Sequence, residues 1–276
     1  MLLLGLAAIL ILFTILWAVS LRLENSSIAD VAWAPGILVV GLIYYFTSDG
    51  APLRAHLTLA LLAIWALRLG AHLGLRTRLQ GEDFRYVRWR EEYEQWWLVS
   101  YFKVFLLQAV VGWLVSLPIY FAIVSVEPTA LTMLDYLGVL LVVGGLVFEG
   151  VADEHLRRFR ADRANRGKVL DTGLWSYTRH PNYFGEALVW WGFGVIAFAT
   201  GGVPGLLGPL VLTYLLIYVS GVALLESTLI EKRGYIQYAG KTPAFLPLPP
   251  QVRAQLMTKL KSLKKPPPPP RAKWRY

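Results

Sequence analysis

The stretch SYTRHPNYFGEALVWWG sets two cations, Arg179 and His180, directly before an apolar run. The proline that follows them is a residue favoured in the first turn of a helix. Asn182 and Glu186 come next, and their spacing of four places them on one helix face. Free backbone N–H groups at such a helix start, beside an arginine and a histidine, would bind an anion, with phosphate the natural candidate. The alternative is a capped helix whose two cations face lipid headgroups.

A second set of ionisable residues lies in the apolar stretch that precedes this one. Its four members are spaced i, i+4, i+8 and i+11, so a helix would carry them on one face: Glu149, Asp153, Arg157 and Arg160. Ionisable groups inside a membrane helix are costly and usually face a functional cavity. Asp153 and Arg157 also fit an ordinary ion pair at a helix end. Glu149 lies one helical turn deeper in the apolar stretch, so an ion pair at the helix end does not account for it.

The last apolar run ends on another acid, Glu226, and Tyr235 and Tyr238 follow it shortly. Tyrosine hydroxyl groups could bond to phosphate or ribose at the mouth of a cofactor site. Aromatic anchoring at the membrane interface explains the two tyrosines equally well.

Three more ionisable residues lie in apolar surroundings in the N-terminal half. Asp30 lies at one end of the second apolar run, and Arg68 and His72 lie four residues apart in the third. Because Arg68 stands within an otherwise apolar helix, we expect it to face a cavity or an acid such as Asp30. A structural ion pair explains Arg68 and Asp30 as well as catalysis does.

The elements that carry these residues are predicted to be membrane helices. The chain has 276 residues, of which 56% are hydrophobic and 16% charged, and its mean hydropathy is +0.49. A soluble domain carries about 25% charged residues, and a spanning helix needs about 20 apolar residues. The fold class is therefore all-α, a polytopic membrane protein with about seven transmembrane helices, at 2–19, 29–46, 55–75, 103–124, 136–155, 183–199 and 203–226.

The basic residues predict the orientation of the chain. The segments 76–102 and 156–182 are rich in arginine, and the stretch from residue 232 onward holds eleven Lys or Arg, whereas the alternate loops are poor in both. By the positive-inside rule, the N-terminus is out and the C-terminus cytoplasmic. The same cations could instead serve only topology and lipid contact. The absence of cysteine excludes disulfides and thiolate chemistry, and the four scattered histidines predict no metal site.

One long run resembles the steroid 5-alpha-reductase superfamily, in particular a bacterial branch that carries the reductase C-terminal domain. That run is FEGVADEHLRRFRADRANRGKVLDTGLWSYTRHPNYFGEALVWWG, with YIQYAGKTPAFLPLPP after it. NSSIADVAW and GEDFRY extend the likeness toward the N-terminus. The resemblance implies a seven-helix enzyme that transfers a hydride from NADPH to an activated carbon–carbon double bond. It implies one membrane domain at 1–250, with substrate-side helices at 1–135 and a cofactor-binding half at 136–250, followed by a basic proline-rich tail at 251–276.

The resemblance also suggests roles for the polar residues. Cofactor binding is expected of Glu149, Asp153, Arg157, Arg160, Arg179, His180, Asn182, Tyr183, Glu186, Glu226, Tyr235 and Tyr238. The abundance of arginine favours NADPH over NADH, because a 2′-phosphate requires a cation. The steroid enzymes carry a Gln-Glu pair that this sequence lacks. By their approximate positions in the chain, Asp30, Arg68 and His72 correspond to the catalytic residues of those enzymes. Asp30 or His72 would supply the general acid that the reduction needs.

Two other classes of protein remain open. Isoprenylcysteine carboxyl methyltransferases share an Arg-His-Pro-x-Tyr-x-Gly motif and bind S-adenosylmethionine there, but their Glu-Glu pair is broken here, because Ser227 follows Glu226. A transporter or lipid-binding protein is the non-enzymatic alternative, and no repeat symmetry supports it. We expect an apolar, lipid-like substrate entering from the bilayer, membrane lipids as the other partners, no nucleic acid and no obligate protein partner. The expected location is the bacterial inner membrane, with the cofactor site facing the cytoplasm.

Overall fold

The fold is built from helices only. The computed structural model describes residues 1–219, 221–229 and 234–255, and no strand occurs among them. The helices are α1 (Leu2–Leu23), α2 (Ile28–Phe46), α3 (Pro52–Gln80), α4 (Phe84–Glu92), α5 (Trp96–Ser100), α6 (Leu107–Val115), α7 (Leu117–Val124), α8 (Met133–Ala161), α9 (Pro181–Ala199), α10 (Leu207–Tyr214), α11 (Val222–Leu229) and α12 (Tyr235–Lys241). Most of the basic tail predicted at 251–276 lies outside the described residues.

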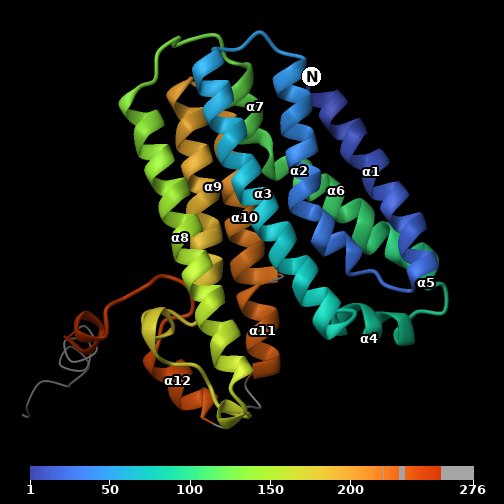
Figure 1. Cartoon of the computed structure of the whole chain (residues 1–276), viewed down its shortest axis with the longest axis vertical. Coiled ribbons are helices and arrows are strands. Elements are labelled where there is room, and N and C mark those ends of the chain that lie inside the picture. The colour runs from blue at the N-terminus through green and yellow to red at the C-terminus, as the bar shows by residue number, and fades with distance from the viewer. Residues whose placement is uncertain (220, 230–233, 256–276) are drawn as a thin grey trace, which may run out of the picture.

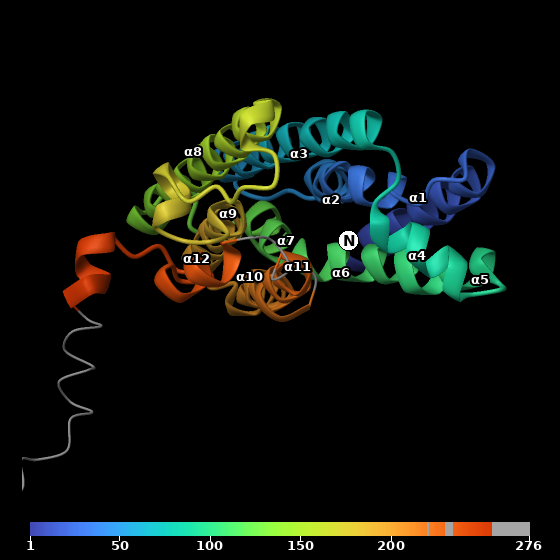
Figure 2. The same ribbon diagram turned by 90° about the horizontal axis from the view of Figure 1, so that it is seen from below.

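Six helical segments are long and apolar enough to cross a membrane, which confirms a polytopic membrane protein. They are Leu2–Leu23, Ile28–Phe46, Pro52–Gln80, Trp96–Val115, Met133–Ala161 and Val203–Glu226, the last with residue 220 undescribed. The remaining predicted span, at 183–199, corresponds to α9, a helix of 19 residues that packs mainly against α8. Seen from below, α8, α3, α2 and α1 follow one side of the molecule, and α9, α7, α10 and α6 lie along the other (Figure 2).

The span predicted at 103–124 is wrong in its bounds. The membrane-length segment is Trp96–Val115, in which a π-helical stretch at Tyr101–Leu106 joins α5 to α6. The helix breaks at Ser116, and α7 begins as a separate helix with Pro118 in its first turn. Proline has no backbone N–H to donate into the preceding turn, so an uninterrupted helix through this point would lose a hydrogen bond.

Glycines bring α8 and α9 into direct contact. A Cβ atom on Gly145 would lie 2.6 Å from the carbonyl oxygen of Gly185, and one on Gly192 would lie 2.7 Å from that of Gly138. A Cβ on Gly185 would meet the backbone nitrogen of Glu149 at 2.7 Å. Small residues permit this approach between membrane helices. Gly192 therefore serves helix packing.

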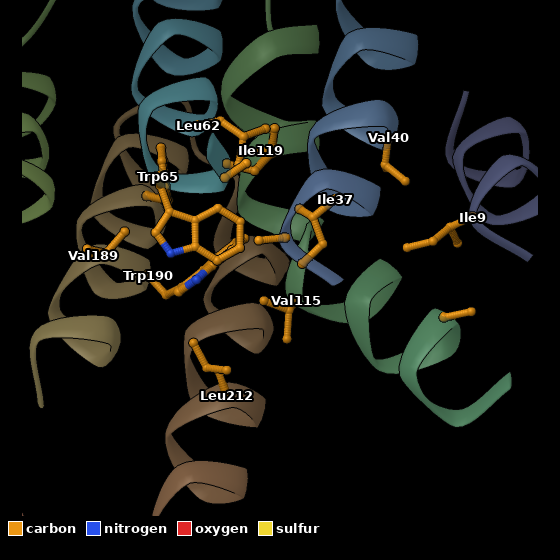
Figure 3. Packing of buried hydrophobic residues seen from close by; sticks show 14 of the residues in the cluster. Ile9, Ile37, Val40, Leu62, Trp65, Val115, Ile119, Val189, Trp190 and Leu212 are labelled. Atoms are coloured by element: carbon orange, nitrogen blue, oxygen red, sulfur yellow. The ribbon is translucent and has the colours of Figure 1, made fainter. Parts of the chain in front are cut away.

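The apolar core lies where these helices meet the N-terminal ones (Figure 3). Trp65 of α3 and Trp190 of α9 are both fully buried, with ring centroids 4.9 Å apart in an edge-on arrangement. Such aromatic pairs contribute about 0.5–1.5 kcal/mol beyond the area that they bury. Ile37, Leu62 and Ile119 join them in the same cluster, so the core links the two halves of the chain.

A buried ion pair joins α3 to α8 at the end of the molecule opposite α12. Nε of Arg54 donates to Oδ1 of Asp135 at 2.8 Å, and both side chains are wholly buried. The remaining guanidinium nitrogens donate to the carbonyl oxygens of Pro128 and Ala130 at 2.6 and 2.9 Å. Asp135 also closes a capping box with Thr132 at the start of α8. Each of the three guanidinium nitrogens of Arg54 thus has a hydrogen-bond partner, as a buried charge requires.

The basic connections gather at one end of the bundle. The α3–α4 connection, the segment after α8 and α12 all lie toward the lower end of the molecule in Figure 1, and the connections before α3 and before α8 lie at the top. This grouping agrees with the charge pattern of the sequence. Which end faces the cytoplasm stays a prediction.

Single cysteines test that orientation, because the natural chain contains none. We predict that Ala164→Cys reacts with an impermeant maleimide only from the cytoplasmic side and that Thr129→Cys reacts from the other side. Both positions are exposed. The labelling pattern in sealed, right-side-out and inverted vesicles measures this. Reversed labelling at both positions would contradict the predicted topology.

The Arg54 pair predicts a large effect on stability. Arg54→Ala leaves the Asp135 carboxylate buried without its partner, which costs about 3–5 kcal/mol in comparable sites. The control is Arg22→Ala, at an exposed arginine in the last turn of α1. Thermal unfolding in detergent should show a much lower midpoint for Arg54→Ala than for Arg22→Ala. Equal midpoints would show that the pair does not hold α3 to α8.

Candidate functional site

Arg179 and His180 are engaged by the protein itself. The Arg179 guanidinium forms a two-point contact with the Glu226 carboxylate, at 2.7 and 2.9 Å, and its third nitrogen donates to the carbonyl oxygens of Ala239 and Thr242 at 2.7 and 2.8 Å. Nε2 of His180 lies 3.2 Å from Glu226 Oε1. The direct anion contact expected of this pair is therefore not what the geometry favours. Instead, the two residues tie the start of α9 to α11 and α12.

A cavity of about 430 Å³ opens beside this tie, between the end of α8, the segment 162–180, α11 and α12. Besides Arg179, four cationic side chains line it: Arg160, Arg163, Arg166 and Lys168. None of the four makes a side-chain hydrogen bond or ion pair with the described part of the chain. Unpaired cations facing a cavity of ligand size form a site for an anionic molecule.

Aromatic residues form the wall of the cavity toward α12. Trp175 donates its ring N–H to the carbonyl oxygen of Ala152 at 3.2 Å, and the Tyr238 hydroxyl donates to the carbonyl oxygen of Trp175 at 2.6 Å. The Tyr235 hydroxyl is buried without a hydrogen-bond partner among the described residues. Burial, reinforced by the nearby Glu226 carboxylate, raises the pKa of Tyr235 to about 12, so its hydroxyl remains a donor at neutral pH. Tyr235 can therefore donate to a ligand, whereas Tyr238 holds the wall.

Deeper in the bundle, Arg68 bridges two acids of α8. Its two terminal nitrogens form ion pairs with Glu149 and with Asp153. The expectation that Arg68 pairs with Asp30 is wrong, because α8, not α2, presents the acids to this face of α3. Asn182 donates to Asp153 Oδ1 at 3.3 Å and also lines the cavity, and His72 lies 3.8 Å from Asp153. Asn182 thus connects the cationic cavity with the buried acids.

Glu186 lies in the same region, held by two tryptophans. The indole N–H groups of Trp65 and Trp190 donate to its two carboxyl oxygens at 2.9 and 3.1 Å. Glu186 is only 6% exposed, so these donors replace the water that its carboxyl group has lost. The position of Trp65 in the sequence carries no signal of its contact with Glu186, because the two residues lie on different helices.

Asp30 belongs to a separate polar cluster on the N-terminal side. It accepts hydrogen bonds from Arg85 at 2.8 Å, from the Tyr86 hydroxyl at 2.6 Å and from Gln108 at 2.8 Å. The two stretches NSSIADVAW and GEDFRY meet here, since Ser27 accepts a bond from the backbone N–H of Asp83 at 2.7 Å. The structure therefore brings Arg68 and His72 together but places Asp30 apart from them.

Arg157 and Tyr183 occupy positions that spacing alone did not reveal. Arg157 is exposed, pairs with Glu154 at 2.6 Å instead of Asp153, and does not line the cavity. At about 100° per residue, a position eight residues along is rotated by about 80° from the first, so Arg157 leaves the face that Glu149 defines, whereas Arg160, eleven residues along, returns to it. The Tyr183 ring stacks on His180 with centroids 5.4 Å apart.

Half of the predicted cofactor residues line the cavity: Arg160, Arg179, His180, Asn182, Tyr235 and Tyr238. Glu149, Asp153 and Glu186 form the buried acidic cluster behind it, and Glu226 holds Arg179. The prediction omitted Arg163, Arg166, Lys168 and Trp175, although the first three lie in the basic segment 156–182. Among the described residues, no three His, Cys, Asp or Glu side chains are grouped so that they could hold a metal ion.

These features define a polytopic helical membrane protein with a cation-lined cavity at its basic end. The family described as "Protein of unknown function (DUF1295)" matches residues 16–242, so the chain belongs to that family. An uncharacterized protein of Schizosaccharomyces pombe is 27% identical over 214 residues, which cover 68% of this chain and 62% of the relative. The match thus spans less than two thirds of that relative's length. No solved structure matches the chain.

The burial of His180 predicts a pH dependence of stability. Burial lowers the pKa of His180, an effect that its bond to Glu226 only partly offsets. Below about pH 6.5, the unfolded chain binds a proton that the folded chain does not, so stability falls as the pH drops through that value. We expect the thermal midpoint to decrease between pH 7.5 and 5.5, and His180→Gln to lose part of that slope. An unchanged slope in His180→Gln would contradict the assignment.

Proposed function

We propose that the protein is a membrane-embedded, NADPH-dependent reductase that transfers a hydride to an activated C=C bond of a lipid-like substrate, such as a steroid or an enone. The observation that carries this proposal is the cavity lined by Arg160, Arg163, Arg166 and Lys168. The resemblance of the surrounding sequence to the steroid 5-alpha-reductase superfamily supports it independently.

The chemistry of the cavity suits a polyphosphate ligand. Arginine presents planar N–H groups that bind phosphate oxygens in pairs, and three of the four unpaired cations are arginines. The Tyr235 hydroxyl offers a further donor at the opposite wall. The volume of the cavity lies within the range of about 300–1,000 Å³ that small-molecule sites occupy. The cavity residues would hold the phosphates, and Asn182 would face the part of the cofactor nearest the buried acids.

The same charges disfavour the alternative, an S-adenosylmethionine-dependent methyltransferase. S-adenosylmethionine has a sulfonium cation and no phosphate, so the four cations would gain little from it and would repel its positive centre. The ion pair between Glu226 and Arg179 also differs from the role of a paired carboxylate in such enzymes, because both oxygens of Glu226 are engaged by Arg179.

The proposed reaction needs a proton as well as a hydride. NADPH supplies the hydride, which adds to one carbon of the double bond with its electron pair, and the protein must add a proton to the other carbon. His72 is half-exposed and lies beside Asp153, which suits it to deliver that proton. Asp30 accepts three hydrogen bonds and is better placed to position Tyr86 and Gln108 than to act as the acid.

The membrane location completes the proposal. Six apolar helices support an integral membrane protein, and the proposed cofactor cavity lies at the basic end that the positive-inside rule assigns to the cytoplasm. The substrate would enter sideways from the bilayer. A bacterial inner membrane is the proposed site of action, with membrane lipids as the other partners.

Paired arginine variants test the cofactor assignment. Arg163→Ala combined with Arg166→Ala removes two charge-assisted contacts worth about 1.5–3 kcal/mol each. We therefore expect NADPH affinity, measured by equilibrium dialysis of detergent-purified protein, to fall by about 100-fold or more. The control is Arg157→Ala combined with Arg158→Ala, two exposed arginines that pair with Glu154 outside the cavity.

The control pair should retain the affinity of the natural protein. Equal losses in both double variants would mean that the cations act through general charge and not through a specific site. No binding of NADPH by the unmodified protein, together with binding of S-adenosylmethionine, would replace the reductase by the methyltransferase.

A further inference from the structure

The buried acids behind the cavity are more numerous than the cations that face them. Three carboxyl groups lie together, those of Glu149, Asp153 and Glu186, and their exposed fractions are 4%, 9% and 6%. Among the described residues, α3 contributes the one guanidinium in contact with them, Arg68, and the half-exposed His72 lies near Asp153 alone. The group therefore carries an excess of acid in a region where unpaired charge is costly.

Glu149 and Glu186 are pressed together by the contact between their helices. The backbone of Gly185, next to Glu186, lies so close to Glu149 that a Cβ atom on this glycine would meet the Cβ of Glu149 at 2.7 Å. Because Glu186 directly follows Gly185 in α9, the same contact brings the two acids close together in the bundle. Two neighbouring ionised carboxylates repel each other, and neither has a hydrogen to donate.

One carboxyl oxygen of the two glutamates lacks a hydrogen-bond donor. Both oxygens of Glu186 accept bonds from indole N–H groups, and Oε1 of Glu149 faces Arg68. The other oxygen of Glu149, Oε2, is buried and has no partner among the described residues. A proton on that oxygen would satisfy it and give the pair the donor that it lacks.

We propose that Glu149 and Glu186 form a proton-sharing carboxyl pair, which holds one proton at neutral pH inside the membrane domain. The other groups that face the pair set its charge: Arg68 from α3 neutralises one carboxylate, and Asp153 from α8 takes up the second nitrogen of Arg68. With one guanidinium for three carboxyl groups, the cluster keeps two uncompensated negative charges when all three are ionised and one when the pair shares a proton. Sharing is the outcome in known carboxyl pairs.

The pair gives the proposed reduction a source for its proton, and this role rests on the proposed function. His72 and Asn182 both contact Asp153, so the acidic cluster connects the half-exposed histidine with the cavity wall. A proton stored at Glu149 and Glu186 could reload the group that delivers a proton to carbon after each hydride transfer. The store itself requires neither the cofactor nor the substrate.

Infrared spectroscopy tests the pair in the detergent-purified full chain. We expect a carbonyl band of a protonated carboxylic acid at neutral pH, which shifts in heavy water. Glu149→Gln and Glu186→Gln should each abolish the band, because either substitution leaves a lone carboxylate stabilised by its remaining donors. Glu154→Gln, on the exposed side of the same helix, should leave the band unchanged.

Three outcomes would overturn the proposal. They are absence of the band in the natural protein, its loss in only one of the two pair variants, and its loss in Glu154→Gln. The first needs no variant, so a folding defect in a substituted chain cannot hide it. A carbonyl band in a protein that does not bind NADPH would support the carboxyl pair and contradict the proposed function. NADPH binding by a protein without the band would support the proposed function and contradict the carboxyl pair.

Discussion

The contact between α8 and α9 is the constraint on which the rest of the site depends. Glycines at matching positions let the two backbones touch, and no larger residue fits at Gly145, Gly185 or Gly192 without displacing main-chain atoms. This approach places Glu149 against Glu186 and Asp153 beside Asn182. It also fixes the segment 162–180, which connects the two helices and carries most of the free cations of the cavity. A wider helix spacing would separate the cavity from the acids.

The guanidinium groups of two arginines fix the two ends of the packed pair α8 and α9. Arg54 joins α3 to the start of α8 at one end, and Arg179 joins the start of α9 to α11 and α12 at the other. Each guanidinium group uses its donors on a carboxylate and two backbone carbonyl groups. Removing either acid would strand a cation that has few other partners. Arg54 and Arg179 thus have structural roles, whereas Arg163, Arg166 and Lys168 stay available to a ligand.

The sequence predicted the fold better than it predicted the site. Apolar length alone located the membrane helices, and it failed at 103–124 because the break at Ser116 occurs within apolar residues that carry no hydropathy signal. Spacing placed Glu149 and Asp153 together correctly, since they are one turn apart. It failed for Arg157, because helical phase drifts along a stripe, and for Arg68, because a partner on another helix depends on tertiary packing. The bond from Trp65 to Glu186 has the same tertiary origin, whereas Trp190 lies four residues after Glu186 in α9, a spacing that is visible in the sequence.

The central claim is that the cationic cavity binds a phosphate-rich cofactor, and thermal stabilisation of the unmodified protein tests it most directly. The midpoint of unfolding in detergent would be compared with NADPH, NADH and S-adenosylmethionine. A ligand at 100 times its dissociation constant adds about 2.7 kcal/mol of stability. The account predicts stabilisation by NADPH, less by NADH and none by S-adenosylmethionine. Stabilisation by S-adenosylmethionine alone would contradict it.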